Sequence, residues 1–374
     1  MTFLPPEGWG QPPWRLATRT PCGRLPSRVE VAVIGGGFTG LATACWLRRL
    51  APQRSVALLE AGRFGQGASG RTGGVVLDET AGGELAGLGD VLEGLVSSLA
   101  ELRIDCSLRS SGVWEISRRE GRQDSPIGWR DSGRLRVADE VAGGTLNPGR
   151  LVVGLVRRAQ DCGAVLQEQA RVKRIRFDNP LRLELDGGEL EAEQALLGVN
   201  GSGMELLPWL PFDRARFTLA VATAPLSQKQ FERLGMKPGK PFYTLDLPYL
   251  WGRPLGRNRL IFGGGLVRPE SPRSIHGLDV RTGEAARLLA SLEARVRGLV
   301  PGLTSLQFTH RWGGPILLAP AGRPILCRDP RSERVLVLGG YTGQGVALSV
   351  YLARWAAEAL LEQRELPEWG QVKS

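Results

Sequence analysis

A strand, a glycine-rich turn and a helix follow one another near the N-terminus, and this succession constrains the fold more than any other feature. Residues 29–34 form a β-branched run typical of a buried parallel strand. Gly35, Gly37 and Gly40 follow in the spacing G-x-G-x-x-G. In such a turn the first glycine permits the tight bend, the second lets a pyrophosphate approach the backbone, and the third allows close helix–strand packing.

The residues after the turn complete a βαβ unit. A helix is expected over 41–50 and a second strand over 55–59, which ends at Glu60. At that position a carboxylate can accept hydrogen bonds from an adenosine ribose, and the start of the helix offers unpaired N–H groups to phosphates. Strand, glycines, helix, strand and acid in this order favour dinucleotide binding over an ordinary βαβ unit with a glycine turn.

A second glycine-rich segment, residues 65–74, distinguishes between dinucleotides. Its sequence G-Q-G-A-S-G-R-T-G-G holds five glycines, which suits a backbone against which a large planar cofactor presses. The segment resembles the D-amino-acid-oxidase-like family of FAD-dependent oxidoreductases, most closely the gamma-glutamylputrescine-oxidase and glycine-oxidase types. In that branch the loop reads G-A-S-G-R-N-G-G, and Thr72 stands here in place of the Asn.

A third glycine turn near the C-terminus supports the resemblance. A strand is expected over 334–338 and a helix over 346–363, with the turn at 339–345 between them. In the family this turn places the helix N-terminus at the flavin pyrimidine, where its positive end stabilises negative charge on the reduced ring. The family usually has His where this chain has Gln344.

Further stretches at 13–18, 146–151, 170–172 and 196–201 resemble the family in the same order, and the resemblance implies a set of cofactor-binding residues. Backbone contact with the adenine is implied at Val172. The expected FAD-binding residues are Gly35, Gly37, Phe38, Thr39, Gly40, Glu60, Ala61, Arg63, Ala68, Ser69, Gly70, Arg71, Thr72, Gly73, Gly74, Val172, Asn200, Gly201, Gly340, Thr342, Gly343, Gln344 and Gly345.

Two departures from relatives bear on substrate and on cofactor attachment. Glycine-oxidase-like members carry an Arg that pairs with the substrate carboxylate, and Gly343 occupies that position here, which disfavours glycine as substrate. Sarcosine-oxidase-like members attach flavin through a Cys upstream of a T-P-D stretch. The matching stretch here is 319–321, the Cys position falls near Gly314, and Cys327 lies past it. We therefore expect FAD without a covalent link.

The resemblance implies oxidation of the C–N bond of an amine or amino acid by hydride transfer to flavin N5. The imine then hydrolyses, and oxygen is the expected electron acceptor. Three alternatives stay open: a dehydrogenase of the same fold that passes electrons to a carrier or quinone, a non-catalytic flavin-binding subunit, and an RNA-associated flavin enzyme. Since a flavin needs little acid–base help from the protein, no catalytic base is nominated.

The predicted fold is α/β, with a Rossmann-type FAD-binding domain and an inserted α+β substrate domain built on a mostly antiparallel sheet. Period-two alternation across 213–270 indicates that sheet, and 282–300 is an amphipathic helix. The expected boundaries are 29–85, 145–212 and 310–365 for the FAD domain, 86–144 and 213–309 for the substrate domain, and 1–28 for an extended surface leader.

Substrate-facing candidates come from two stretches, the strand region at 243–253 and residues 311–314. Tyr243, Tyr249 and Trp251 are suited to wall an apolar or cationic pocket and Arg253 to pair with an anion, and Arg311 is a further candidate. The alternative is that these side chains belong to the core and rim of the sheet. His310, beside Arg311, is interpreted as structural rather than flavin-facing.

Composition excludes several other classes of protein. The chain of 374 residues has a net charge of +10, yet all but five of its 48 basic residues are Arg, scattered singly or in pairs. This indicates an arginine bias rather than a nucleic-acid patch. The five Cys and two His show no ligand spacing, so neither a metal nor a disulfide framework is expected.

The uncharged stretch 31–47 is short for a membrane span and contains the glycine turn. Without a signal peptide or transmembrane segment, a cytoplasmic location is expected. The oligomeric state is left open.

Overall fold

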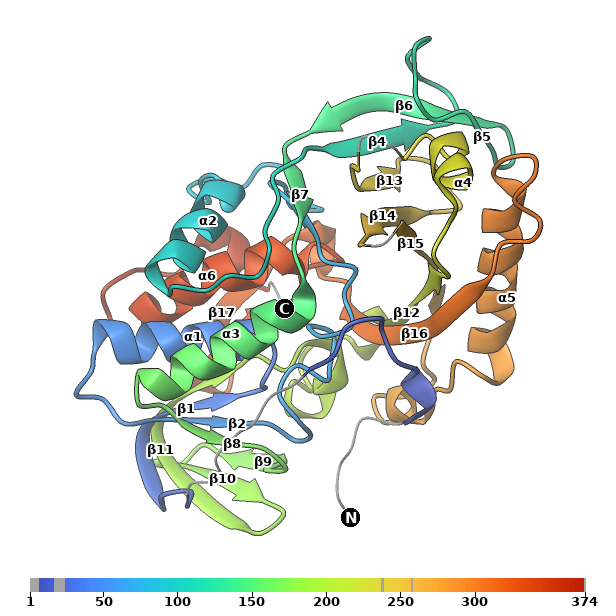
Figure 1. The fold of residues 1–374 in the computed structure, drawn as a ribbon. Coiled ribbons are helices and arrows are strands. Elements are labelled where there is room, and N and C mark those ends of the chain that lie inside the picture. The colour runs from blue at the N-terminus through green and yellow to red at the C-terminus, as the bar shows by residue number, and fades with distance from the viewer. Residues whose placement is uncertain (1–6, 17–23, 237–238, 257, 373–374) are drawn as a thin grey trace.

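The computed structural model describes residues 7–16, 24–236, 239–256 and 258–372, and most of its strands lie in two large sheets (Figure 1). The first sheet has eight strands. Its main path runs β17 (Ile325–Asp329), β18 (Ser332–Gly339), β11 (Gly188–Leu197), β1 (Arg28–Ile34), β2 (Val56–Leu59) and β8 (Val165–Gln167), with β10 (Leu181–Leu185) and β9 (Val172–Arg176) extending from β11.

The centre of this sheet is parallel and buried on both faces. β1 pairs in parallel with β2 and β11, and β11 with β18, so that Val33 lies between Leu58 and Leu196. Four helices cover one face (Figure 1), namely α1 (Phe38–Leu50), α2 (Val91–Glu101), α3 (Pro148–Asp161) and α6 (Gly345–Leu360). The predicted Rossmann-type fold is confirmed.

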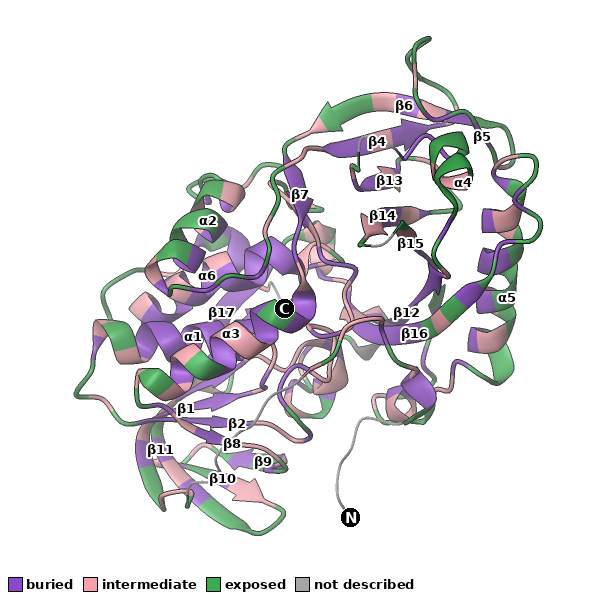
Figure 2. Ribbon diagram, in the orientation of Figure 1, coloured by how far each residue is buried: buried purple, intermediate pink, exposed green. Residues whose placement is uncertain are grey.

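The second sheet is mostly antiparallel. Its eight strands are β16 (Phe308–Leu317), β12 (Ala215–Thr223), β15 (Arg259–Val267), β14 (Trp251–Leu255), β13 (Phe242–Thr244), β4 (Val113–Ser117), β6 (Arg134–Val141) and β5 (Trp129–Arg130). Helix α5 (Gly283–Gly298) covers one face, burying Leu289, Leu292 and Val296 while its outer side stays exposed (Figure 2). The short helix α4 (Gln228–Arg233) and the pair β3 (Val75–Leu77) and β7 (Gly143–Thr145) complete the elements.

The structure differs from the predicted boundaries at two places. Strand β16, part of which was assigned to the FAD domain, pairs along its whole length with β12 in the second sheet. Helix α2, assigned to the substrate domain, instead packs against α6, because Val91, Leu95 and Leu99 form an apolar stripe that fits the first core. The residues of β16 and α2 do not by themselves indicate these contacts, because their partners, β12 and α6, lie far away in the chain.

The leader also departs from expectation. Trp9 is buried in the core beneath the second sheet, and its Nε1 donates to the Ile275 carbonyl over 3.1 Å. Gly10 forms an isolated bridge with Trp312 of β16. The described part of the leader is therefore anchored in the fold rather than extended over its surface, and the family-like residues 17 and 18 lie outside the described residues.

Among the residues that the structure describes, no helix combines the length and apolar character needed to cross a bilayer. Within the same ranges no group of three His, Cys, Asp or Glu side chains is arranged to hold a metal ion.

A buried ion triad joins α5 to the far end of the second sheet. The Asp131 carboxylate, whose side chain is 7% exposed, accepts from Arg118 over 2.6 Å and from Arg295 over 2.5 Å. Arg295 also donates to the carbonyls of Pro248 and Tyr249. The triad thus holds the β13–β14 connection, which carries one of the predicted substrate residues.

We expect Asp131→Ala to lower the free energy of unfolding by about 3 kcal/mol, because two poorly exposed guanidinium groups lose their counter-ion. The control Asp186→Ala breaks an ion pair with Lys173 in which both side chains are about half exposed, and should cost less than about 1 kcal/mol. Urea unfolding followed by tryptophan fluorescence measures both. Equal losses in the two variants would contradict a structural role for the triad.

Candidate cofactor and substrate site

The first glycine turn is as tight as its spacing predicts. Gly35 has φ +108°, and a Cβ there would lie 2.7 Å from the Gly198 carbonyl oxygen. A Cβ on Gly40 would lie only 2.0 Å from the Gly35 oxygen. Both contacts are with backbone that has no room to shift, so a larger residue at either position would open the turn.

The start of α1 meets the second glycine segment. Ser69 Oγ accepts from the Phe38 N–H over 2.8 Å, and a Cβ on Gly37 would lie 2.7 Å from that oxygen. Ser69 thus satisfies one N–H of the first helical turn, leaving others for an anionic group. Thr39 Oγ1 lies 2.8 Å from the buried hydroxyl of Tyr341, which ties the C-terminal glycine turn to the same helix end.

Glu60 lies at the end of β2, beside the first turn. Its two carboxylate oxygens accept from the N–H groups of Gly36 over 2.7 Å and Gly62 over 2.8 Å. Burial raises the pKa of Glu60 above its ordinary value, against the lowering effect of these two bonds. Each oxygen keeps a lone pair for a hydroxyl donor.

The expected adenine end lies alongside this carboxylate. The Ala170 N–H donates to the Glu60 carbonyl over 2.9 Å, and this brings Val172 at the start of β9 close to β2. Ala61 is half-buried and the Arg63 side chain is exposed.

Packing within the protein already requires glycine at most positions of residues 65–74. A Cβ would lie 2.6 Å from the Val152 side chain at Gly65, 2.2 Å from the Gly65 oxygen at Gly70, 2.1 Å from the Trp251 ring at Gly73 and 2.4 Å from the Leu146 oxygen at Gly74. Protein atoms thus exclude side chains at four of the five positions. Gly67 alone has no atom within 4 Å.

Side chains from outside this segment hold its carbonyl groups. Trp14 Nε1 donates to the Gly70 carbonyl over 2.7 Å and Trp312 Nε1 to the Arg71 carbonyl over 2.8 Å, while Arg253 Nε donates to the Gly73 carbonyl. The segment is therefore fixed by the leader and by the second sheet. Ala68 and Thr72 are half-buried within it.

Arg71 is a predicted FAD-binding residue, and much of its guanidinium is hydrogen-bonded to main-chain carbonyl groups of the protein. Nε donates to the Gln66 carbonyl, and Nη1 lies within 3.2 Å of the carbonyls of Trp9, Gly10 and Gly313. Burial among these neutral acceptors lowers the Arg71 pKa to about 10. The side chain therefore remains cationic at neutral pH.

The C-terminal turn closes over the end of β11. Asn200 Oδ1 accepts from the Gly340 N–H over 3.3 Å, and Thr342 Oγ1 accepts from the Ala319 N–H over 2.9 Å. A Cβ on Gly201 would lie 3.0 Å from the Ile316 oxygen, so close packing against β16 favours glycine at this position. Gly343 has φ +96° and is exposed, and α6 begins at Gly345.

These residues fit a flavin dinucleotide. The Gln344 side-chain oxygen is buried without a hydrogen-bond partner among the described residues, as is that of Gln66 in the second glycine segment. A buried amide oxygen without a donor is costly, and a ligand that brings N–H or O–H groups would satisfy it. The N-termini of α1 and α6, and the Glu60 carboxylate, which can accept hydrogen bonds from a ribose, belong to the same set of segments.

The predicted substrate residues Tyr243, Trp251 and Arg253 share one face of the second sheet. Tyr243 pairs across strands with Trp251, and Arg253 follows two residues later on β14. Trp251 packs over Gly73, so this face looks toward the second glycine segment. Tyr249 precedes β14 and is 46% exposed.

Tyr243 holds two carboxylates that were not expected in the site. Its hydroxyl lies 2.6 Å from Glu115 Oε1 and 2.9 Å from Glu79 Oε1. Burial and these two carboxylates raise the Tyr243 pKa far above its ordinary value, so the phenol stays protonated. Glu115 lies on β4 directly beside Tyr243. No motif marks Glu79 or Glu115. The pairing of β4 with β13 brings Glu115 to Tyr243, and Glu79 comes from the segment after β3.

Arg253 carries a buried positive charge that few protein groups stabilise. It is 6% exposed, and among the described residues its guanidinium makes one hydrogen bond, from Nε to the Gly73 carbonyl, and no ion pair. Burial lowers its pKa to about 10, which leaves it charged at neutral pH.

Arg311 is not brought together with these residues. It precedes Trp312 on β16 and so points to the opposite face, where it pairs with Glu293 of α5 over 2.5 Å. His310 Nδ1 lies 2.9 Å from Thr309 Oγ1, and burial lowers the pKa of His310.

Comparison with characterised sequences places the chain among flavin enzymes. A family profile described as FAD dependent oxidoreductase (DAO) matches residues 30–359. The chain is 28% identical to the probable oxidoreductase OrdL of Rhizobium meliloti, covering 92% of this chain and 86% of the relative. It is 26% identical to the gamma-glutamylputrescine oxidoreductase of Escherichia coli, covering 88% and 83%.

Solved structures show the same fold. Glycine oxidase from Geobacillus kaustophilus superposes with a TM-score of 0.69 at 20% identity, covering 91% of this chain and 96% of that one. L-proline dehydrogenase from P. horikoshii superposes with a TM-score of 0.71 at 16% identity, covering 92% and 96%. The family resemblance drawn from the glycine segments is confirmed, and the chain belongs to the DAO family of FAD-dependent oxidoreductases.

Proposed function

We propose that the chain binds FAD without a covalent link. The support is the first glycine turn with Glu60, the α1 N-terminus with Ser69, and the C-terminal turn with Gln344. Gly314 offers no thiol at the position where relatives attach flavin, and Cys327 is buried in β17. The other predicted cofactor residues border these three segments.

We propose further that the enzyme oxidises the C–N bond of an amine or amino acid, and the observation that carries this is the sheet face at the second glycine segment. Arg253 supplies a buried positive charge there, while Glu115 and Glu79, joined through Tyr243, supply negative charge. A face with both signs of charge suits a substrate with an amino group and a carboxylate. When bound, FAD supplies the hydride acceptor.

The residues on this face have separate roles in the proposal. The Arg253 guanidinium orients the substrate by pairing with an anionic group. Trp251 packs over Gly73 and excludes water from that side of the site. Tyr243 keeps its single proton and donates it to one of the two carboxylates at a time, and both carboxylates are offered to a cationic part of the substrate. Hydride transfer uses the lone pair of a neutral amine, so a substrate that arrives as an ammonium first loses a proton to water or to a carboxylate of this face.

Oxygen is the proposed electron acceptor, and the alternative is a dehydrogenase that passes electrons to a carrier or quinone. An anaerobic titration of the purified holoenzyme with amines, N-methyl amino acids and D-amino acids separates the two. We expect one class to bleach the visible flavin band and air to restore it. Bleaching that persists in air would favour the dehydrogenase, and no bleaching by any class would contradict oxidation of these compounds.

Flavin retention tests the cofactor site. We expect Gly37→Ala to reduce the ratio of flavin to protein at least about tenfold, because its Cβ would lie 2.7 Å from Ser69 Oγ and disturb the phosphate end of α1. Gly187→Ala is the control, since that position has no atom within 4 Å. Absorbance at the flavin and protein bands measures the ratio. Full flavin content in Gly37→Ala would contradict the assigned site.

Selectivity tests the role of Arg253. We expect Arg253→Met to raise KM roughly thirtyfold for amines with a carboxylate, because a charged hydrogen bond contributes about 2 kcal/mol. Amines without a carboxylate should be affected much less. Arg311→Met, on the opposite face, should change neither class. An equal loss for both substrate classes in Arg253→Met would indicate that Arg253 only supports the Gly73 carbonyl.

A further inference from the structure

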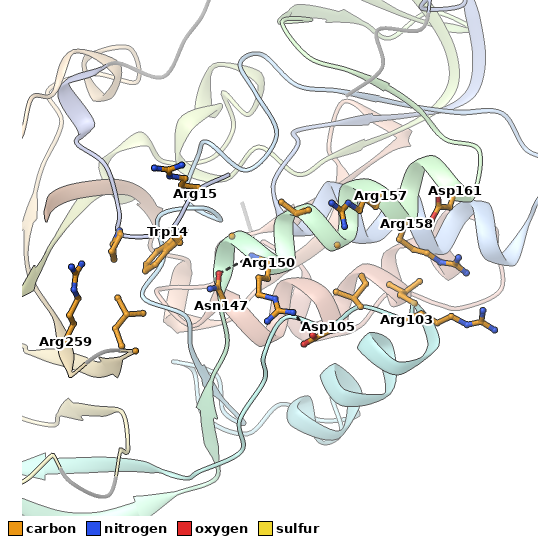
Figure 3. A pocket seen from close by; sticks show the side chains of 18 residues that line it. Trp14, Arg15, Arg103, Asp105, Asn147, Arg150, Arg157, Arg158, Asp161 and Arg259 are labelled. Carbon is orange, nitrogen blue, oxygen red and sulfur yellow. Dashed lines mark hydrogen bonds and ion pairs between the residues drawn. The ribbon is translucent and has the colours of Figure 1, made fainter. Parts of the chain in front are cut away.

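A groove of about 1020 Å³ runs along the exposed side of α3 (Figure 3). Its walls come from four parts of the chain: α3 itself, the segment after α2 at 102–105, the leader at 13–15, and the connection between β14 and β15. Its charged lining is strongly unequal, with two aspartates, Asp105 and Asp161, against six arginines, Arg15, Arg103, Arg150, Arg157, Arg158 and Arg259.

Most of this positive charge is uncompensated. Arg150 pairs with Asp105 over 2.6 Å. Within the described ranges the other five arginines form no ion pair, and the Nε groups of Arg158 and Arg259 are buried without a hydrogen-bond acceptor. Other arginines in the described part of the chain also lack a carboxylate partner, so what distinguishes the groove is the gathering of six arginines beside two aspartates.

The charge is spread along the groove rather than gathered at one point. Arg150 and Arg157 are seven residues apart on α3, which corresponds to about 10 Å along the helix. Figure 3 shows Arg259 and Trp14 toward one end of the groove, and Arg103 and Arg158 toward the other. One phosphate or carboxylate cannot reach all of these groups, so the distribution favours an elongated anionic occupant.

The lining also has apolar and acidic parts. Trp14, Ile104, Val153 and Leu255 provide apolar surface between the arginines. Asp105 and Asp161 would repel a continuous chain of phosphates, whereas a polypeptide can place its carboxylates beside the arginines and its apolar side chains between them. We propose that this groove docks an acidic, partly apolar segment of a partner protein. The proposal does not depend on which amine the enzyme oxidises.

A binding experiment on the flavin-loaded full chain tests the docking site. The probe is a fluorescein-labelled peptide of Glu-Glu-Leu repeats, with a Gln-Gln-Leu peptide as its neutral counterpart, and fluorescence anisotropy gives the Kd. We expect the acidic peptide to bind, to weaken as salt rises, and to bind about tenfold or more weakly to the double variant R157E/R259E. The neutral peptide should bind much more weakly than the acidic one.

The matched control is R268E/R287E, which makes the same change of net charge at two exposed arginines outside the groove. It should leave the Kd of the acidic peptide within about twofold of the unmodified protein. Unchanged flavin content and melting temperature show that both double variants are folded. The proposal is overturned if the unmodified protein does not bind the acidic peptide, or if both double variants lose binding equally. Tighter, groove-dependent binding of polyuridylate than of the peptide would assign the groove to nucleic acid instead.

Discussion

The hydrogen bonds around Arg71 are the interaction on which the rest of the structure depends. A cation buried among main-chain carbonyl oxygens is stabilised only while all the segments that supply those oxygens stay in place. Here they are the leader at Trp9 and Gly10, the second glycine segment at Gln66, and β16 at Gly313. One side chain thus joins the second glycine segment, the second sheet and the N-terminal leader. Lysine would not replace it, because a single ammonium cannot address carbonyls in several directions.

This arrangement explains why the cofactor half could be predicted from the sequence and the substrate half much less so. The first turn, Glu60 and Ser69 belong to short segments whose spacing already determines their geometry, and the structure places them at one helix end. Period-two alternation likewise predicted the strands of the second sheet, since it depends only on one face being buried. These are local constraints, and local constraints are visible in a single sequence.

Several features that the sequence did not reveal depend on which distant segments pack together. Glu115 reaches the Tyr243 hydroxyl because β4 lies beside β13, more than a hundred residues later in the chain, and Glu79 reaches it from the segment after β3. Arg311 was expected near the substrate, yet a one-residue offset from Trp312 turns it to the other face of the sheet. The glycines at 65–74 were attributed to cofactor contact, whereas protein atoms such as the Trp251 ring occupy most of the space beside them.

The positions of the arginines suggest that this chain binds the flavin and an anionic group of the substrate with different parts of the fold. The C-terminal turn has Gly343 where glycine-oxidase-like members carry an arginine, so the turn itself offers no cation for a carboxylate. Besides Arg71, whose guanidinium is occupied by main-chain carbonyls, a buried cation near the second glycine segment is Arg253, which comes from the second sheet. Recognition of an anionic group would then be separate from the flavin turn. Because β14 pairs through its backbone, its side chains can change without altering that pairing. A fold organised in this way can keep one cofactor geometry while the charge of its substrate face varies.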